Sequence, residues 1–101
     1  MKVLLLCGFG MSTSLLTSHM MKNGDPGDVV EAFPISDMQD QIPRFDVVLL
    51  GPQIKFKLPE VESIARPKGI PVGVIDMRSY GMMDGKAAMA QARELMAARS
   101  Q

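Results

Sequence analysis

Two short segments of this chain are almost entirely apolar, and they restrict the fold more than any other feature. They are KVLLLC at Lys2–Cys7 and DVVLLG at Asp46–Gly51. Runs of this length without alternating polar residues are typical of strands that are buried on both faces of a parallel sheet. Helices must then cover both faces of the sheet, so the two segments predict an α/β protein.

Two further strands and four helices are predicted around these segments. The strands are VVEAFPI at Val29–Ile35, where Pro34 indicates a sheet edge, and PVGVID at Pro71–Asp76. The helices are Met11–Asn23 with a C-cap at Asn23-Gly24, Ser36–Ile42 with a Ser36 cap, Pro59–Arg66, and Asp84–Ala98 with an Asp84 cap. Strands that alternate with helices predict right-handed crossover connections.

The predicted sheet has four parallel strands in the order 2-1-3-4, with helices on both faces, as in a flavodoxin-like three-layer sandwich. The 101 residues form one domain, 1–101, without a linker or an internal repeat. In such a sheet, ligands bind outside the carboxyl ends of the first and third strands. Cys7 ends the first strand and Gly51-Pro52-Gln53 follows the third, so this edge of the sheet is the expected site.

The composition excludes several classes of function. Eleven basic residues balance eleven acidic ones, which argues against binding to nucleic acid. No apolar run approaches the roughly 18 residues that a membrane span needs, and no targeting segment is predicted. One cysteine cannot form an internal disulfide, which favours a cytoplasmic protein, and one cysteine with one histidine is too few ligands for a metal site. No cofactor is predicted.

The segment after Cys7 combines glycines with hydroxyl groups at the start of a predicted helix. Its residues are Gly8, Phe9, Gly10, Met11, Ser12, Thr13 and Ser14. Glycines allow successive backbone N–H groups to face one anion, and the helix N-terminus adds partial positive charge. The same field lowers the pKa of a thiol, into a range of about 3.5–7.5. The segment therefore predicts phosphate binding beside a reactive thiolate, and thus a phosphocysteine. A buried structural cysteine is the alternative.

Other readings of the same segment fit less well. Thr13 occupies the third glycine position of the dinucleotide-binding pattern, and neither the Walker pattern nor a Cys-x-x-Cys motif is present. His19 lies about 12 Å along the helix from Met11, too far to reach Cys7, and is predicted to be an ordinary helix-surface residue. Low-molecular-weight tyrosine phosphatases resemble the site, but their Cys-x5-Arg motif has Thr13 here in place of the arginine. Without that clamp for the phosphoryl oxygens, a phosphocysteine would persist, so a phosphoryl carrier is favoured over a phosphatase-like or arsenate-reductase-like enzyme.

Several motifs together resemble the enzyme IIB component of the phosphoenolpyruvate-dependent sugar phosphotransferase system, in its lactose/cellobiose/diacetylchitobiose family. They are Cys-x-x-Gly-Met-Ser-Thr-Ser at Cys7–Ser14, VVLLGPQ at Val47–Gln53, VID at Val74–Asp76 and YGMMDG at Tyr80–Gly85. They occur in the order and spacing of the family and span nearly the whole chain. One departure is Phe9, because the family commonly has a small residue there.

The resemblance implies a cytoplasmic phosphotransferase that acts as a monomer and meets the membrane only through a partner. Cys7 would accept a phosphoryl group from a histidine of a IIA protein. It would pass the group to a sugar, expected to be a β-linked disaccharide such as cellobiose, held by a membrane IIC protein. The backbone of Gly8 to Ser14 would hold the phosphate.

Residues from neighbouring strand ends are expected to border this site. Gln53 and Tyr80 are candidates for its rim, with a turn position and a packed ring as the respective alternatives, and Asp76 is interpreted as a cap or turn residue. Because both partners must reach Cys7, their docking surfaces must overlap. The predicted docking face consists of Phe9, Met11, Gln53, Ile54, Tyr80, Met82 and Met83, with burial in the core as the alternative for each of them.

Overall fold

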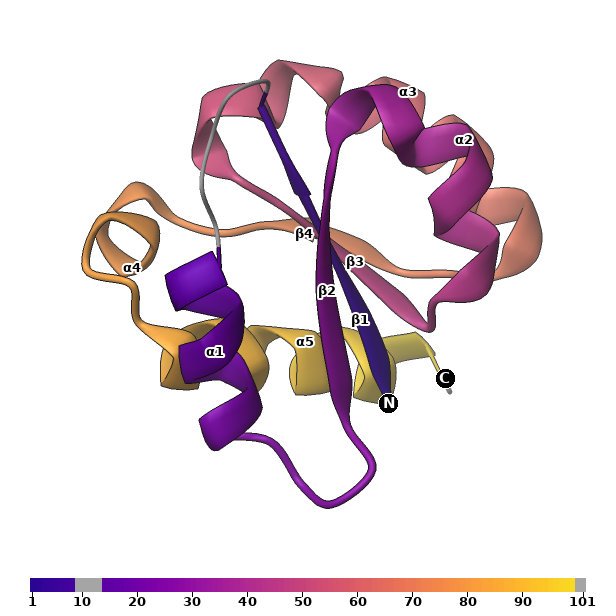
Figure 1. Ribbon diagram of the computed structural model, residues 1–101. Helices are drawn as coiled ribbons and strands as arrows, with labels where there is room; N and C mark the ends of the chain where they lie inside the picture. The colour runs from indigo at the N-terminus through magenta and orange to yellow at the C-terminus, as the bar shows by residue number, and fades with distance from the viewer. Residues whose placement is uncertain (9–13, 100–101) are drawn as a thin grey trace.

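The computed structural model describes residues 1–8 and 14–99, and its centre is a four-stranded parallel sheet. The strands are β1 (Lys2–Cys7), β2 (Val29–Pro34), β3 (Val47–Leu50) and β4 (Val72–Val74), and they lie in the order β2-β1-β3-β4 (Figure 1). The predicted strand order is therefore confirmed, as is the edge position of the strand that contains Pro34.

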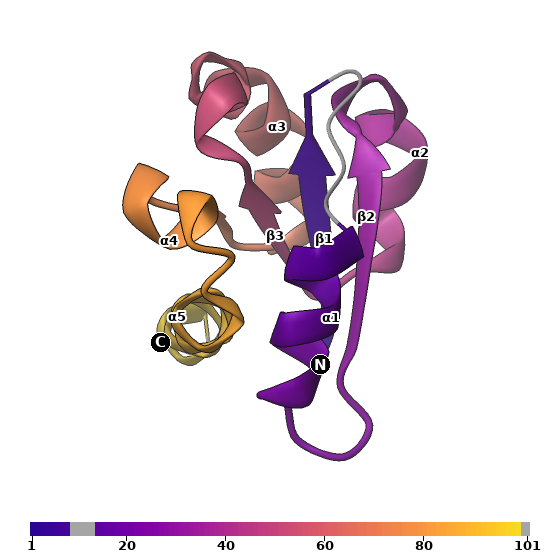
Figure 2. The ribbon, with the colours of Figure 1, turned by 60° about the vertical axis from the view of Figure 1, so that its left-hand side comes forward.

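Helices cover both faces of this sheet, as the apolar strands predicted. On one face lie α1 (Ser14–Lys22), α4 (Met77–Gly81) and α5 (Gly85–Arg99), and on the other lie α2 (Met38–Gln41) and α3 (Leu58–Ala65) (Figures 1 and 2). Figure 2 shows α1 beside α5, with α1 in front of β1 and β2. Among the described residues, no helix has the length and apolar character that crossing a membrane would need.

The sheet divides the core into two layers, because successive side chains of a strand point to opposite faces. The α1/α5 layer contains Val3, Leu5, Cys7, Leu16, Met20, Val30, Val47, Leu49, Ile75, Tyr80, Ala88, Met89 and Ala92. The α2/α3 layer contains Leu4, Leu6, Ile42, Phe45, Val48, Leu50, Ile54, Val61, Ala65 and Ile70. The cysteine therefore faces α1, α4 and α5 rather than α2 and α3.

Several predicted element boundaries and caps are wrong. The region 36–42 is a one-turn α2 between two 3₁₀ turns, and Ser36 does not cap it: the residue before α2 is Asp37, which makes no side-chain cap hydrogen bond. Gly24 lacks the left-handed backbone of a glycine C-cap. Instead, the Asn23 side-chain amide donates to the carbonyl of His19 at 2.8 Å and satisfies the last turn of α1.

Two predicted helix starts are confirmed. Asp84 caps α5, because its Oδ1 accepts from the Ala87 N–H at 3.0 Å, and Pro59 lies in the first turn of α3. Among the helical segments that were not predicted, two directly follow strands: the 3₁₀ helix Pro52–Lys57 after β3 and α4 after β4. Both follow carboxyl ends of strands, so both contribute to the edge where the site is expected.

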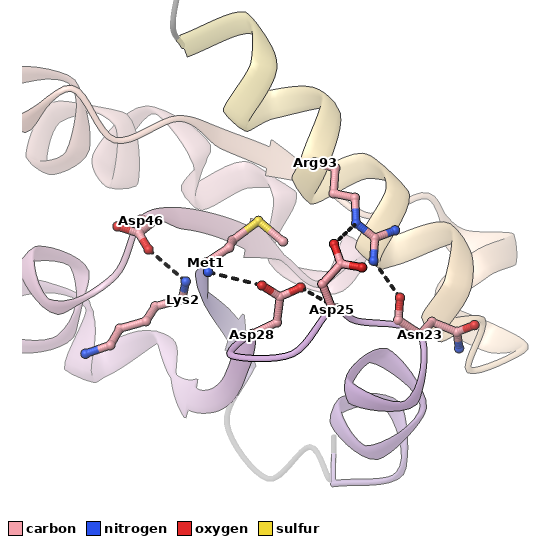
Figure 3. A network of polar contacts seen from close by, with 7 residues as sticks. All are labelled: Met1, Lys2, Asn23, Asp25, Asp28, Asp46 and Arg93. Atoms are coloured by element: carbon pink, nitrogen blue, oxygen red, sulfur yellow. Dashed lines mark hydrogen bonds and ion pairs between the residues drawn. The ribbon is translucent and has the colours of Figure 1, made fainter.

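A polar network connects segments at the edge of the sheet where β1 and β2 begin, opposite the carboxyl edge (Figure 3). The carboxylate of Asp28 accepts from the Asp25 N–H at 2.8 Å and contacts the Met1 ammonium at 3.1 Å. Arg93 on α5 donates to the Asn23 carbonyl at 2.6 Å and contacts Asp25 at 3.9 Å. The network joins α5 to the α1–β2 connection, far from the carboxyl ends of the strands.

This network predicts a loss of stability in acid. The Asp25 N–H, and then the Met1 ammonium and Arg93, hold the pKa of Asp28 below 3.8. A carboxyl whose folded-state pKa is depressed contributes stability above its unfolded pKa and loses it as the pH falls through the folded pKa. We expect Asp28→Asn to have a lower free energy of unfolding than wild type at pH 7. As the pH falls below about 4, this free energy should decrease less steeply in the variant than in wild type. Urea unfolding as a function of pH measures this, and an unchanged acid slope would contradict it.

Candidate functional site

Cys7 is the last residue of β1 and lies between two neighbouring strands. In the sheet register it is opposite Pro34 of β2, and on its other side the Gly51 N–H donates to the Leu6 carbonyl at 3.0 Å. The side chain is only 5% exposed, and its Sγ lies 3.7 Å from the Leu5 carbonyl. The thiol therefore occupies the central strand at the carboxyl edge, covered on the α1/α5 side.

Gly51 allows two side chains to approach this edge closely. A Cβ at Gly51 would lie 3.2 Å from Oε1 of Gln53 and 3.3 Å from Cε2 of Tyr80. Both contacts are tighter than ordinary van der Waals distances, so a larger residue would push Gln53 or Tyr80 away. The structure thus brings the two predicted rim residues together at Gly51, next to Cys7. The sequence places Gly51 at this edge but does not indicate its close contacts with both side chains.

Tyr80 is a buried neighbour of the cysteine. Its side chain is 5% exposed and belongs to the α1/α5 layer with Cys7. Burial, and then the negative charge of the Cys7 thiolate, raise the pKa of Tyr80 above 10.0. The phenol is therefore neutral at neutral pH and keeps a proton to donate. The packed ring is therefore confirmed, and the position of Tyr80 at the site rim stays a prediction.

Asp76 positions Tyr80 by starting α4. Its carboxylate accepts from the Ser79 N–H at 2.9 Å and from the Ser79 hydroxyl at 2.7 Å. These hydrogen bonds, the backbone one first, lower the pKa of Asp76 below 3.8. The interpretation of Asp76 as a cap is confirmed, and the cap fixes the start of the helix that carries Tyr80.

Most of the predicted phosphate loop lies outside the described residues. This applies to Phe9, Gly10, Met11, Ser12 and Thr13, so the predicted anion site and the lowered thiol pKa stay predictions. Gly8 is partly buried directly after β1, and Ser14 is the first residue of α1. Within residues 1–8 and 14–99, no group of three acidic, histidine or cysteine side chains is arranged to hold a metal ion.

The predicted docking face needs correction in part. Ile54 and Tyr80 are 6% and 5% exposed, so neither offers much surface to a partner, and Met83 is partly buried. Gln53 is exposed and Met82 is 67% exposed. Four large apolar side chains outside the predicted face are also exposed on segments that follow β1, β3 and β4. They are Leu15, Met21, Phe56 and Met77, at 55%, 49%, 70% and 75%.

His19 is not the ordinary surface residue that was predicted. It is partly buried, and its Nδ1 lies 2.8 Å from the Met83 carbonyl, in the turn between α4 and α5. The prediction was wrong because it considered only the distance from His19 to Cys7 along one helix. Contacts between α1 and a turn 64 positions later cannot be read from that helix alone.

Comparison with known proteins agrees with this arrangement. Residues 2–91 match the family described as "PTS system, Lactose/Cellobiose specific IIB subunit". The chain is 43% identical to the cellobiose-specific EIIB component of Lactococcus lactis, with 93% of this chain and 94% of the relative covered. It is 41% identical to the oligo-beta-mannoside-specific EIIB component of Bacillus subtilis, with 94% and 95% covered.

A solved structure shows the same fold at moderate identity. The solution structure of the cellobiose-specific phosphotransferase IIB component from Borrelia burgdorferi superposes with a TM-score of 0.79 at 36% identity. The superposition covers 98% of this chain and 94% of that one. The chain therefore belongs to the lactose/cellobiose-specific IIB subunits of the sugar phosphotransferase system, and it is a phosphotransferase component of sugar phosphorylation.

Proposed function

We propose that Cys7 carries the phosphoryl group in this phosphotransferase. The observation that supports this most directly is the position of the only cysteine, at the carboxyl end of the central strand β1 and beside Gly51 and the buried Tyr80. Ligands of doubly wound sheets bind at this edge. A cysteine with a purely packing role could occupy any interior position of the strand.

The proposed transfer has two displacement steps. First, the Cys7 thiolate attacks the phosphorus of a phosphohistidine on a IIA protein, so that an S–P bond forms and the N–P bond breaks. The electron pair of that bond stays on the imidazole nitrogen. Second, a hydroxyl oxygen of the sugar attacks the same phosphorus, the S–P bond breaks, and the electron pair returns to the Cys7 sulfur. The hydroxyl proton passes to solvent or to a base of the partner.

Tyr80 and the loop after Cys7 are proposed to stabilise the group while it is held. The phenol of Tyr80 keeps its proton at neutral pH and can donate to a phosphoryl oxygen or to the thiolate. The backbone N–H groups of residues 8–14 are proposed to bind the remaining oxygens at the start of α1. Gln53, exposed beside Gly51, is proposed to lie at the rim.

The sequence supports a carrier rather than a hydrolase. Thr13 stands where the phosphatase motif has arginine, so the loop lacks the bidentate clamp for rapid attack by water. We therefore favour the carrier over a phosphatase-like or arsenate-reductase-like enzyme. We propose that it acts in the cytoplasm as a monomer, without a cofactor, and meets the membrane IIC protein only during transfer. The names of the two relatives support a β-linked oligosaccharide, such as a disaccharide, as the sugar.

Intact mass spectrometry tests the proposed function. The purified chain is incubated with phosphoenolpyruvate, the general phosphotransfer proteins and a IIA protein of this family. We expect a gain of one phosphoryl group that depends on IIA and is blocked by prior alkylation, because the chain has a single thiol to alkylate. No adduct on the unmodified chain would contradict the proposal. Rapid turnover of an aryl phosphate that is lost on alkylation would favour the phosphatase-like alternative.

We further predict that the partner docks on the exposed side chains at the carboxyl edge of the sheet. In an NMR titration with the IIA protein, shifts are expected for residues 7–8 and 14–15 and for Gln53, Phe56, Met77 and Met82. Methionines adapt their shape, which suits a surface that meets two partners in turn. Shifts confined to residues 23–28 or 66–69, at the opposite edge, would show that the proposed surface is wrong.

A further inference from the structure

The hydrogen bond of His19 has a defined direction. Its partner is the carbonyl oxygen of Met83, which can only accept, so Nδ1 of His19 must carry the proton and donate at 2.8 Å. His19 therefore lies on the helix that follows the predicted phosphate loop and holds a backbone group of the α4–α5 turn.

The turn that His19 holds has an unfavourable backbone conformation. Met83 has a φ of 53°, and it is the only non-glycine residue with positive φ in the described parts of the chain. Residues other than glycine, asparagine and aspartate rarely adopt this backbone region, so the conformation of Met83 depends on the surrounding contacts. The donor from His19 is one such contact, and the Gly85 N–H, which reaches the same carbonyl at 3.0 Å, is another.

The position of the turn is passed on to Tyr80 through short backbone bonds. The Met83 N–H donates to the Tyr80 carbonyl at 3.1 Å, and the Asp84 N–H donates to the Ser79 carbonyl at 2.8 Å. Tyr80 in turn packs against Gly51, next to Cys7. A continuous series of contacts therefore runs from His19 through Met83 to the ring of Tyr80.

Helices α1 and α5, which flank the turn that His19 contacts, are in direct contact. A Cβ at Gly85 would lie 2.3 Å from the backbone carbonyl carbon of His19 and 2.4 Å from the backbone nitrogen of Met20. The backbone of α1 and the first residue of α5 therefore touch at the point where His19 projects to the turn. The backbone of His19 is therefore packed against the start of α5, close to the turn whose Met83 carbonyl its ring contacts.

We propose that His19 is a positioning residue that holds Tyr80 at Cys7 by donating a hydrogen bond to the Met83 carbonyl. The proposal rests on the function proposed for Cys7. Without this bond, the turn relaxes toward a more ordinary backbone conformation, and the phenol of Tyr80 moves away from the phosphoryl group.

The test compares variants of His19 for phosphoryl transfer from phosphorylated IIA. His19→Ala removes the donor and is expected to slow transfer by about tenfold, since small displacements in a site have effects of this size or larger. His19→Asn places an amide N–H where Nδ1 lies and is expected to restore most of the rate. Ser18→Ala, at an exposed neighbour on α1, is the matched control and should match wild type.

Two measurements separate positioning from a general loss of structure. The aromatic proton shifts of Tyr80, the only tyrosine, should move in His19→Ala and return in His19→Asn. In a Tyr80→Phe background, which lacks the phenol proton, His19→Ala should slow transfer by less than twofold. If His19→Ala fails to fold, His19→Asn compared with His19→Asp tests the same point, because the two side chains have one shape and only asparagine can donate.

The outcomes distinguish this inference from the proposed function. If the wild-type chain accepts no phosphoryl group, the function proposed for Cys7 fails. If wild type is phosphorylated but His19→Ala transfers at the wild-type rate with unmoved Tyr80 signals, the positioning role is wrong and the function stands. A tenfold loss that is the same in the Tyr80→Phe background would also overturn the positioning role, since His19 would then act without Tyr80.

Discussion

Replacing Cys7 by serine is expected to abolish phosphoryl transfer through this chain. A serine hydroxyl stays protonated at neutral pH, so the variant lacks the thiolate that attacks phosphorus. Serine is slightly smaller than cysteine and the side chain is nearly buried, so the fold should survive the change. Intact mass after incubation with the donor proteins should show no adduct, and sugar phosphorylation with IIC membranes should fall to background.

A second variant controls for general effects of a substitution. Lys68→Ala changes an exposed side chain at the opposite edge of the sheet and should keep the phosphoryl adduct. If the Cys7→Ser chain gained a phosphoryl group from IIA as wild type does, the carrier would have to be another residue, and the proposed role of Cys7 would be wrong.

Gly85→Ala is expected to cause the largest loss of stability among single conservative changes. The added Cβ would meet backbone atoms of α1 at 2.3 and 2.4 Å, which cannot move aside as a flexible side chain could. Helix α1 or α5 must shift, and both pack in the α1/α5 layer through Leu16, Met20 and Met89. We expect the free energy of unfolding to fall by about 3 kcal/mol, at the upper end of overpacking effects. Urea denaturation measures this change.

Gly81→Ala is the matched control for this prediction. Gly81 is the last residue of α4, it is exposed, and a Cβ there would meet nothing within 4 Å. Alanine in a helix costs less chain entropy than glycine, so this variant should gain up to about 1 kcal/mol or be neutral. Equal stability losses in the two variants would show that the α1–α5 contact is not the cause.

The sheet and the position of Cys7 at its carboxyl edge could be predicted because they depend on local apolar patterns. The segments Lys2–Cys7 and Val47–Leu50 are almost entirely apolar, so both faces of each strand must be buried. Strands of this kind lie at the centre of a parallel sheet. The alternation of the strands with the four predicted helices then indicates parallel strands joined by crossover connections. Cys7 needs only its position at the end of such a strand to be placed at the carboxyl edge.

The parts that could not be predicted depend on short elements and distant contacts. Helix α4 has five residues, too few for a periodic pattern, and its one local signal is the spacing of Asp76 and Ser79. Ser36 resembled a cap, but hydrogen bonding within two 3₁₀ turns replaced the expected single helix. The contact of His19 with Met83 joins residues that are 64 positions apart and needs the packed structure to be seen.

The division of the core into two layers bears on how such chains diverge in evolution. Cys7 and Tyr80 both lie in the α1/α5 layer, so under the function proposed for Cys7 a change of volume there disturbs the fold and phosphoryl transfer together. The α2/α3 layer holds neither residue, and substitutions among its members that conserve volume alter stability alone. We therefore expect lineages to accumulate replacements faster beneath α2 and α3 than beneath α1 and α5. Selection for stability can act on one half of this small domain while the other half remains constrained by phosphoryl transfer.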